Sequence, residues 1–343
     1  SVFLINVPVM VVLLLVAPVL LPGHTAVPGR RVDVLSAVLA LGAILPVIDG
    51  IKSLAADGWS GAAVLTIAVG GVIGSVFVWR QRRLADPLVD LILLGERRFA
   101  TSVSVNLMCM FAMLGNSILM TQYLQSVLGY SPLRAALWSL APTVVVGAVA
   151  PLAAVAANRA GRPAVIVAGL LVGAAGFVVL ASSTGIHTLL PVLVGATLLA
   201  AGIVAATSMI ADYVVGVAPA DRAGATSGLL ETTSELGGAL GIAVLGSIVN
   251  VVFRTNLTDA GFDGEQPRTL TGALAAAHHL PADRAGTAID AARVAFVDGL
   301  TAAAWAGAAA LVLTAALAVW GLRDRPQKRT DSVDDGVAPA THH

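Results

Sequence analysis

Charged side chains are scarce in this sequence. Asp, Glu, Lys and Arg make up 12% of its 343 residues, and 20 acidic residues balance 20 basic ones. A chain without net charge has no general electrostatic attraction for nucleic acid, so we expect no nucleic-acid partner. Aromatic residues are also few, at 5%, which leaves little scope for stacking rings on a ligand.

Cysteine is nearly absent, and the usual catalytic motifs are missing. The single Cys109 excludes a disulfide framework or a thiolate metal cluster within this chain. His278 and His279 have no further ligand at a metal-binding spacing, so we expect a solvated pair and no metal site. The sequence contains no HExxH motif, no P-loop and no pair of catalytic carboxylates in an aqueous loop. These absences predict that the protein is not an enzyme and needs no cofactor.

Apolar residues dominate what remains. They account for 57% of the chain, and the mean hydropathy is +0.88, which is far too high for a soluble domain. We therefore predict an all-α polytopic membrane protein with nine transmembrane helices, because each apolar run is long enough to span a bilayer as a helix. The predicted spans are residues 2–21, 33–51, 61–79, 99–125, 134–157, 163–182, 188–212, 226–252 and 297–322.

The distribution of basic residues predicts the orientation of these spans. If the first span runs inward, fourteen of the lysines and arginines fall in the inner loops. Only Lys52 and Arg134 fall in the short outer loops, and four more arginines lie in the long outer loop 253–296. Short loops rich in Lys and Arg stay in the cytoplasm, so we expect a cytoplasmic C-terminus.

The most informative stretch is 221–249, DRAGATSGLLETTSELGGALGIAVLGSIV. On a helix, its residues divide into two faces. One face carries Gly224, Gly228, Glu231, Glu235 and Gly238, and the other carries Ser234, Gly237, Gly241 and Leu245. The small-xxx-small spacing from Gly237 to Gly241 predicts close packing against a neighbouring helix.

The two glutamates are the best candidates for binding protons and substrate. Glu235 lies about 15 Å along the helix from Ala225, near the middle of a bilayer core about 30 Å thick. A charged carboxylate there costs about 2.5–3.5 kcal/mol, so it normally faces a bundle interior or an aqueous cavity. Glu231 and Glu235 are one turn apart, and each disfavours ionisation of the other, which suits proton exchange. The alternative is a neutral, hydrogen-bonded pair in a structural helix contact.

The span 99–125 carries four amide side chains, at Asn106, Asn116, Gln122 and Gln125. Amides cost less to bury than charges, so they are candidates for lining a substrate cavity. Amides that hydrogen-bond between helices are the alternative, and the sequence does not decide between the two.

Five stretches resemble one transporter family. They are FLINVP at 3–8, GW at 58–59, WRQRRLADPLVDL at 79–91, YLQSVLGYSPLRAAL at 123–137, and GVAPADRAGATSGLLETTSELGGALGIAVLGSIV at 216–249. In this order they resemble the fourteen-helix drug:proton antiporters, the multidrug efflux pumps of the major facilitator superfamily.

The resemblance implies a division of the chain. Residues 1–21 correspond to the last helix of the N-terminal bundle, and 22–98 to two extra central helices with an inner connector. Residues 99–325 correspond to the C-terminal six-helix transport bundle, with the long outer loop 253–296, and 326–343 to a disordered cytoplasmic tail. The first five helices of the family have no counterpart here, so the expected partner is the N-terminal bundle of the same polypeptide.

The resemblance also suggests a gating loop, which the sequence matches only in part. In PLAAVAANRAGRP at 151–163, Arg159, Gly161 and Arg162 match the family, but Asn158 stands where the family usually has Asp. Similarly, Ser234 and Glu235 replace a common arginine-glutamine pair. These departures put an acid-based gating lock in doubt and place the carboxylates in a subset of the family.

The sequence therefore predicts a proton-coupled multidrug efflux transporter, or a fragment of one, in the bacterial inner membrane. Its expected substrates are lipophilic, cationic small molecules exchanged for protons, with the proton gradient as the energy source and the lipid bilayer as its surroundings. The alternative is a membrane scaffold, a sensor or the remnant of a transporter that no longer transports.

Overall fold

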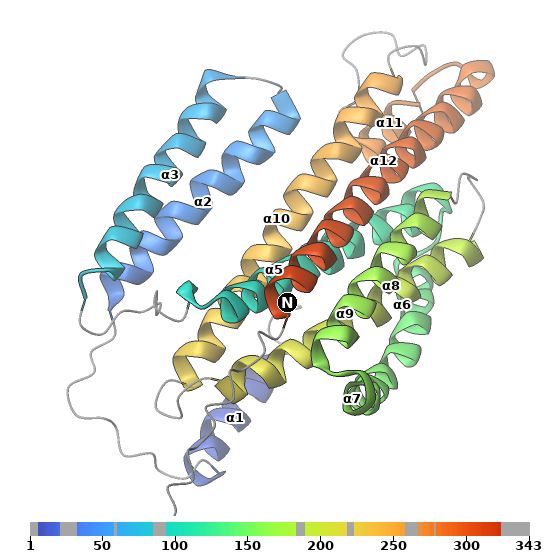
Figure 1. The fold of residues 1–343 in the computed structure, drawn as a ribbon. Coiled ribbons are helices and arrows are strands. Elements are labelled where there is room, and N and C mark those ends of the chain that lie inside the picture. Colours follow the sequence, from blue (N-terminus) through green and yellow to red (C-terminus); the bar gives the residue numbers. More distant parts are fainter. Residues whose placement is uncertain are drawn as a thin grey trace, which may run out of the picture.

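The computed structural model describes residues 6–20, 33–57, 60–84, 94–182, 189–217, 223–257, 267, 269–277 and 279–323. Every regular element in these ranges is a helix, as Figure 1 shows. Eight helical stretches among them are long and apolar enough to cross a membrane. The prediction of an all-α polytopic membrane protein is confirmed.

The first half of the chain contains α1 (Asn6–Leu20), α2 (Val34–Asp57), α3 (Gly61–Gln81), α5 (Arg97–Gln122), the π-helix η2 (Tyr123–Val127), α6 (Pro132–Gly147) and α7 (Val149–Ala160). The second half contains α8 (Arg162–Ser182), α9 (Leu189–Val217), α10 (Ala223–Leu257), α11 (Leu270–Ala277) and α12 (Ala282–Leu322).

The first predicted span is the one that does not reach membrane length in the described residues. Its helix, α1, has 15 residues, or about 22 Å at 1.5 Å per residue. That is shorter than a bilayer core of about 30 Å. Eight spans are therefore found where nine were predicted, with residues 2–5 and 21 lying outside the described ranges.

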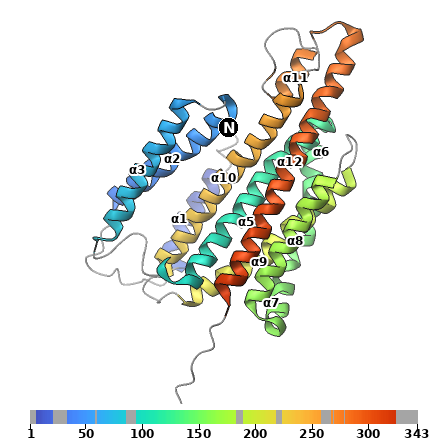
Figure 2. The same cartoon turned by 45° about the horizontal axis from the view of Figure 1, so that its top comes forward.

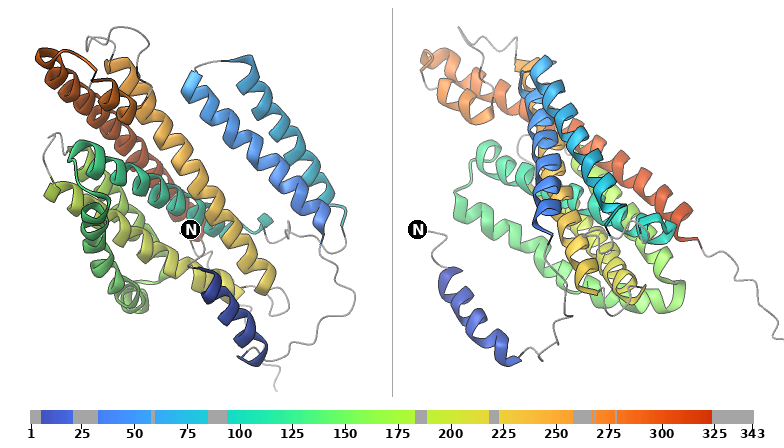
Figure 3. Two further views of the ribbon diagram at one scale, coloured as in Figure 1. Left: turned by 180° about the vertical axis from the view of Figure 1, so that it is seen from behind. Right: turned by 90° about the vertical axis from the view of Figure 1, so that its left-hand side faces the viewer.

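The remaining helices form a hairpin and a bundle. Helices α2 and α3 pair with each other, and α2 also packs on α10. In Figures 1 and 3, α10 lies between this hairpin and the rest of the bundle. Within the bundle, α5 contacts both α10 and α12, an arrangement visible in Figure 2, while α8 packs on α9 and α12. Helix α10 is thus the element that joins the two parts.

Glycines allow the closest helix approaches inside the bundle. A Cβ at Gly176 would lie 2.6 Å from the carbonyl oxygen of Gly195, and one at Gly169 would lie 2.6 Å from that of Gly202. Real Cβ atoms do not come so near to backbone, so α8 and α9 touch through their main chains at these positions. Close contact of this kind is how membrane helices gain packing energy without a hydrophobic driving force.

The hairpin is fastened at one end by a polar cluster. Arg80 of α3 donates to both carboxylate oxygens of Asp33, at 2.8 and 3.1 Å, and Asp33 also accepts from Ser36. Gln81 donates to the Ser36 hydroxyl at 2.7 Å. The hydrogen bonds from Ser36, aided by the charge of Arg80, hold the pKa of Asp33 below its ordinary value.

The predicted span 134–157 is interrupted. It forms α6 and α7, which meet at Ala148, although together they make one candidate span from Pro132 to Ala160. Pro151 has no N–H to donate to the carbonyl oxygen of Gly147, so the helical hydrogen-bond ladder loses a bond at this point. The break changes the helix direction within the span.

Two helices are longer than predicted. Helix α10 has 35 residues and α12 has 41, or about 52 and 61 Å, so both extend beyond a bilayer core. The predicted outer loop 253–296 is therefore corrected in part, since residues 282–296 form the start of α12. Ala288, Ala292 and Phe296 are buried there, and α11 packs on α12, so tertiary packing extends the helix.

Some predictions concern residues outside the described ranges. They are the GW pair at 58–59, the part of the inner connector at 85–93, the loop residues Asp221 and Arg222, the segment 258–266, His278, and the tail from residue 324 onward. These predictions stay untested.

Candidate functional site: the exposed side of α10 and two neighbouring cavities

The two glutamates of α10 lie on its exposed side. Glu231 and Glu235 are both exposed, as are Ser227 and Gly228 about one turn earlier. All four lie within the candidate membrane span Thr226–Leu257. Because a charged group facing lipid is costly at that depth, this side of α10 requires an aqueous or protein surface opposite it. Their role in binding protons or substrate stays a prediction.

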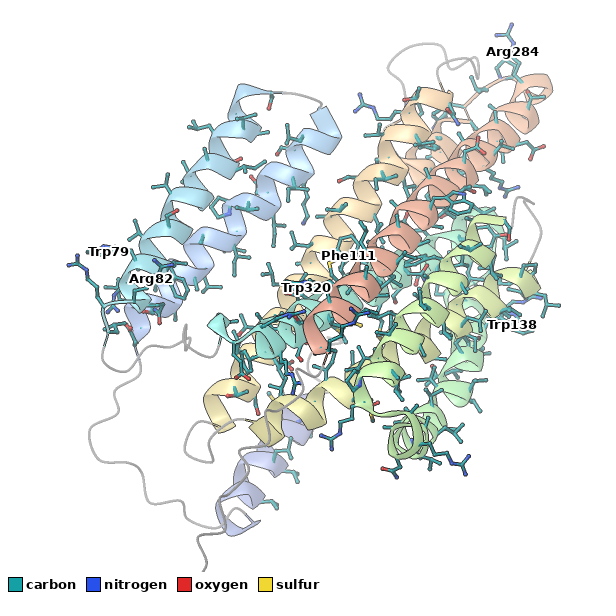
Figure 4. The ribbon with its side chains drawn as sticks, viewed as in Figure 1. Trp79, Arg82, Phe111, Trp138, Arg284 and Trp320 are labelled. Carbon is teal, nitrogen blue, oxygen red and sulfur yellow. The ribbon has the colours of Figure 1, made fainter. Side chains whose placement is uncertain are left out.

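The opposite side of α10 packs on α5 through glycine. A Cβ at Gly237 would overlap the carbonyl oxygen of Leu107, and one at Gly241 would overlap that of Phe111, which is labelled in Figure 4. Across the same contact, a Cβ at Gly115 of α5 would lie 2.9 Å from the carbonyl oxygen of Gly241. The two backbones therefore meet where the Gly237 to Gly241 spacing predicts a helix contact.

Asn106 is part of this contact. Its side chain is buried and donates to the backbone oxygen of Leu230 at 3.2 Å and to the hydroxyl of Ser234 at 2.9 Å. Ser234 in turn donates to Leu230, so the three groups form a closed network between α5 and α10. This geometry is that of an amide bridging two helices, the alternative that the sequence left open.

The other three amides do not share a cavity. Asn116 is half-buried and lines a cavity inside the bundle, whereas Gln122 is exposed and lines a different cavity beside α2. Gln125 is exposed on the π-helix η2 and lines neither of these two cavities. The four amides predicted as a set are thus divided among a helix contact, two cavities and an exposed surface.

The cavity inside the bundle, which we call the inner cavity, lies between α5, α8, α9 and α12. It has a volume of about 40 Å³, and its polar lining residues are Asn116, Tyr123 and Thr301. Tyr123 is the first residue of the π-helix η2, where the helical ladder of α5 widens. Single π-turns of this kind are common at functional sites and supply a point where a helix can rearrange.

The second cavity, which we call the lateral cavity, lies between α2, α5 and α10 and has a volume of about 320 Å³. Four polar side chains line it, Lys52, Gln122, Ser247 and Asn250. The rest of the lining is apolar or glycine: Gly115, Ile118, Leu119, Ile242, Ala243, Gly246 and Val249. Lys52, Ser247 and Asn250 were not predicted as site residues, because a lining that combines α2, α5 and α10 gives no local sequence pattern.

The predicted gating loop forms the turn between α7 and α8. Gly161 ends α7 with φ of 85°, a backbone conformation that favours glycine. Asn158, Arg159 and Arg162 are exposed around it. The backbone explains the glycine, and the gating role of the three polar residues stays a prediction.

The described residues contain no group of three or more His, Cys, Asp or Glu side chains that could hold a metal ion. His279 is exposed.

Comparison with known proteins identifies the family. Residues 1–242 match the model of the Major Facilitator Superfamily, which is more than half of the chain. The chain belongs to this superfamily. The predicted membership of the superfamily is thereby confirmed, together with the multi-pass membrane location that the apolar helices indicate.

Relatives in this superfamily are named for drug efflux or resistance. The chain is 36% identical over 331 residues to multidrug efflux pump LfrA of Mycolicibacterium smegmatis, covering 95% of this chain and 65% of the pump. It is 29% identical to multidrug resistance protein Stp of Mycobacterium tuberculosis, covering 93% and 61%. It is 28% identical to methyl viologen resistance protein SmvA of Salmonella typhimurium, covering 96% and 68%. The chain thus spans about two thirds of the length of these relatives.

Proposed function

We propose that this chain is the C-terminal part of a proton-coupled multidrug efflux transporter of the fourteen-helix antiporter type. The observation that carries the proposal is the pair Glu231 and Glu235, two exposed carboxylates inside a candidate span of a Major Facilitator Superfamily chain. The names of the relatives and the ordered resemblance of motifs support it. In this proposal, α5 to α12 make up the transport bundle, α2 and α3 are central helices, and α1 belongs to a second bundle.

The proposed mechanism is competition between a proton and a cationic substrate for the two carboxylates. Glu231 and Glu235 lie one turn apart, so a bound proton on one favours ionisation of the other. A cation entering from the cytoplasm favours the ionised form, and a proton arriving from outside displaces the cation. Alternating access between two bundles would expose the same carboxylates first to one side and then to the other.

The proposed substrates are lipophilic cations. A carboxylate within an apolar surface attracts positive charge, while the few aromatic residues leave only a small contribution from ring stacking. The relative named for methyl viologen resistance agrees with this class, since methyl viologen is a dication. Protons and the bilayer complete the set of partners, and the proposal needs no cofactor.

The proposed location is the bacterial inner membrane, with a cytoplasmic C-terminus. The support is the excess of basic residues in the inner loops of the predicted topology. Arg80, Arg82, Arg97 and Arg323 lie at or next to helix ends, and the predicted topology assigns these ends to the inner side. Efflux transporters of this superfamily are not enzymes, and we propose no catalytic role for the chain.

The proposal is tested by expressing the complete gene in a bacterium that lacks its own efflux pumps. We expect resistance to methyl viologen and ethidium to rise, with no comparable rise for anionic drugs of similar size. In everted membrane vesicles, ethidium uptake should start on acidification of the lumen and stop when a protonophore is added. Protein that reaches the membrane but moves neither compound would instead favour the scaffold or sensor alternative.

A further inference from the structure

We infer that the lateral cavity is a binding site for an anionic amphiphile, a molecule with a phosphate or carboxylate head and an alkyl tail. Three helices meet there, and one of them, α2, belongs to the hairpin rather than to the bundle. The inference concerns binding alone and does not depend on transport.

The charge of the lining selects the charge of the ligand. Lys52 is the one ionisable residue of the lining, and the described residues offer it no hydrogen bond or ion pair. Asp49, one turn earlier on α2, is exposed and does not line the cavity. An anion therefore finds a cation here that no carboxylate of the lining neutralises.

The remaining polar groups suit the same ligand. Gln122 of α5 and Asn250 of α10 have amide N–H groups that can donate to a phosphate or carboxylate oxygen. The hydroxyl of Ser247 lies in the same lining but already donates to the carbonyl oxygen of Ala243. Ile118, Ile242 and Val249, which line the same cavity, are apolar side chains that an alkyl chain can contact. The alternative is that the side chain of Lys52 merely extends toward the lipid headgroups. That alternative accounts for an exposed lysine, but not for the amide donors of two other helices that line the same cavity.

The volume also fits. At about 320 Å³ the cavity is at the lower end of the range of small-molecule sites, roughly 300–1,000 Å³. Gly246 contributes to this space, since a Cβ at that position would meet no atom within 4 Å. The lateral cavity and the pair Glu231 and Glu235 lie at different positions along α10. The cavity attracts anions, whereas the glutamates attract cations.

Binding is tested on the purified protein from the complete gene, in a neutral detergent. The probe is dodecyl phosphate, compared with dodecanol and dodecyltrimethylammonium, and the dissociation constant is measured by microscale thermophoresis. We expect dodecyl phosphate to bind at least about tenfold more tightly than either comparison compound, because only it pairs with Lys52.

Three variants locate the site. Lys52→Gln should weaken dodecyl phosphate binding by about tenfold, and Lys52→Arg should restore it. Gly246→Leu should abolish it by filling the cavity. The matched control is Arg82→Gln, which removes an exposed cation at the other end of the same hairpin, labelled in Figure 4, and should leave binding unchanged.

Unchanged binding in Lys52→Gln or in Gly246→Leu would overturn the inference, as would equal binding of the cationic comparison compound. If Lys52→Gln does not yield folded protein, Gly246→Leu decides alone. Native mass spectrometry with phosphatidylglycerol distinguishes the source of the ligand. If the wild type retains phosphatidylglycerol and Gly246→Leu loses it, the ligand is a membrane lipid. If dodecyl phosphate binds more tightly than phosphatidylglycerol, the ligand is a diffusible amphiphile.

Discussion

The two sides of α10 have different surroundings, since one packs on α5 and the other is exposed. On one side, Gly237 and Gly241 bring its backbone against α5, and Asn106 closes a hydrogen-bond network to Leu230 and Ser234. On the other side, Glu231 and Glu235 are exposed, and the described residues offer neither of them a hydrogen bond or an ion pair. The groups of the packed side find their partners within this chain. The carboxylates of the exposed side require an aqueous or protein surface opposite them. Substitutions on the packed side should therefore affect assembly, and those on the exposed side should affect transport.

The largest effect is expected from Gly241→Val. The new Cβ would overlap the carbonyl oxygen of Phe111, which is backbone and cannot move aside as a flexible side chain would. Overpacking typically costs about 1–3 kcal/mol, and a backbone clash is at the upper end or beyond. We expect loss of monodisperse protein in fluorescence-detected size-exclusion chromatography. Gly246→Ala, on the same helix but facing open space, is the control. Wild-type yield and stability of Gly241→Val would show that the helices are not in backbone contact.

The second-largest effect is expected from substitutions of the two glutamates, which should reduce transport. Glu235→Gln keeps the size of the side chain and should reduce proton-driven ethidium export by about tenfold or more, with little change in Tm. Glu231→Gln should reduce it less, because Glu231 lies about 6 Å nearer to the start of the span and can reach water there. Export rates in everted vesicles and Tm measured by scanning fluorimetry check both expectations. Normal export by both variants would mean that the exposed side has no coupling role.

A smaller effect is expected from Asn106→Leu. This variant removes two hydrogen bonds between α5 and α10, and we expect a loss of stability of about 1 kcal/mol. Export should continue, since the amide contacts α10 rather than an open cavity. A double-mutant cycle with Ser234→Ala measures the coupling between the two side chains. If Asn106→Leu loses export at unchanged stability, Asn106 contributes to substrate binding rather than to the helix contact.

The smallest effect concerns the hairpin whose helix α2 packs on α10. The pKa of Asp33 is lowered below its ordinary value of 3.8, chiefly by its hydrogen bond from Ser36. A lowered pKa stabilises the folded state above the ordinary value, and this contribution is lost as the pH falls through the lowered pKa. The Tm difference between wild type and Asp33→Asn should thus be full at neutral pH and shrink below pH 3.8. A difference that stays constant across this range would exclude the carboxylate as its source. Arg80→Gln removes the partner charge and serves as the companion variant.

The predictions that succeeded depend on local patterns. Long apolar runs predict spans, and eight of them form helices of membrane length. The helical periodicity of 221–249 places the glutamates and the pair Gly237 and Gly241 on different faces, and the structure exposes the glutamates while packing the pair against α5. These results follow from helical periodicity, which is a property of neighbouring residues along the chain. Gly238, which was predicted on the face of the glutamates, is instead buried against Leu114 of α5.

The features that escaped prediction depend on residues distant in sequence. Lys52 was counted only as a loop charge, yet it lines a cavity with Gln122 and Asn250 from two other helices. Asp33 pairs with Arg80 across 47 positions. The start of α12 was assigned to the loop 253–296, because the apolar run that predicts the last span begins at residue 297. The helix begins earlier, at Ala282, where it packs against α11.

The sequence by itself determined that this protein is an all-helical membrane protein, which residues can span the bilayer, and which face of α10 carries charge. Composition and periodicity suffice for these properties, since hydrocarbon permits few alternatives to the helix. Only the tertiary structure decided that Asn106 bridges two helices, that Asn116 and Gln122 line different cavities, and that Lys52 meets the polar groups of α5 and α10. Those outcomes depend on how the helices pack side by side, and in this chain the packing follows the positions where glycine lets two backbones touch.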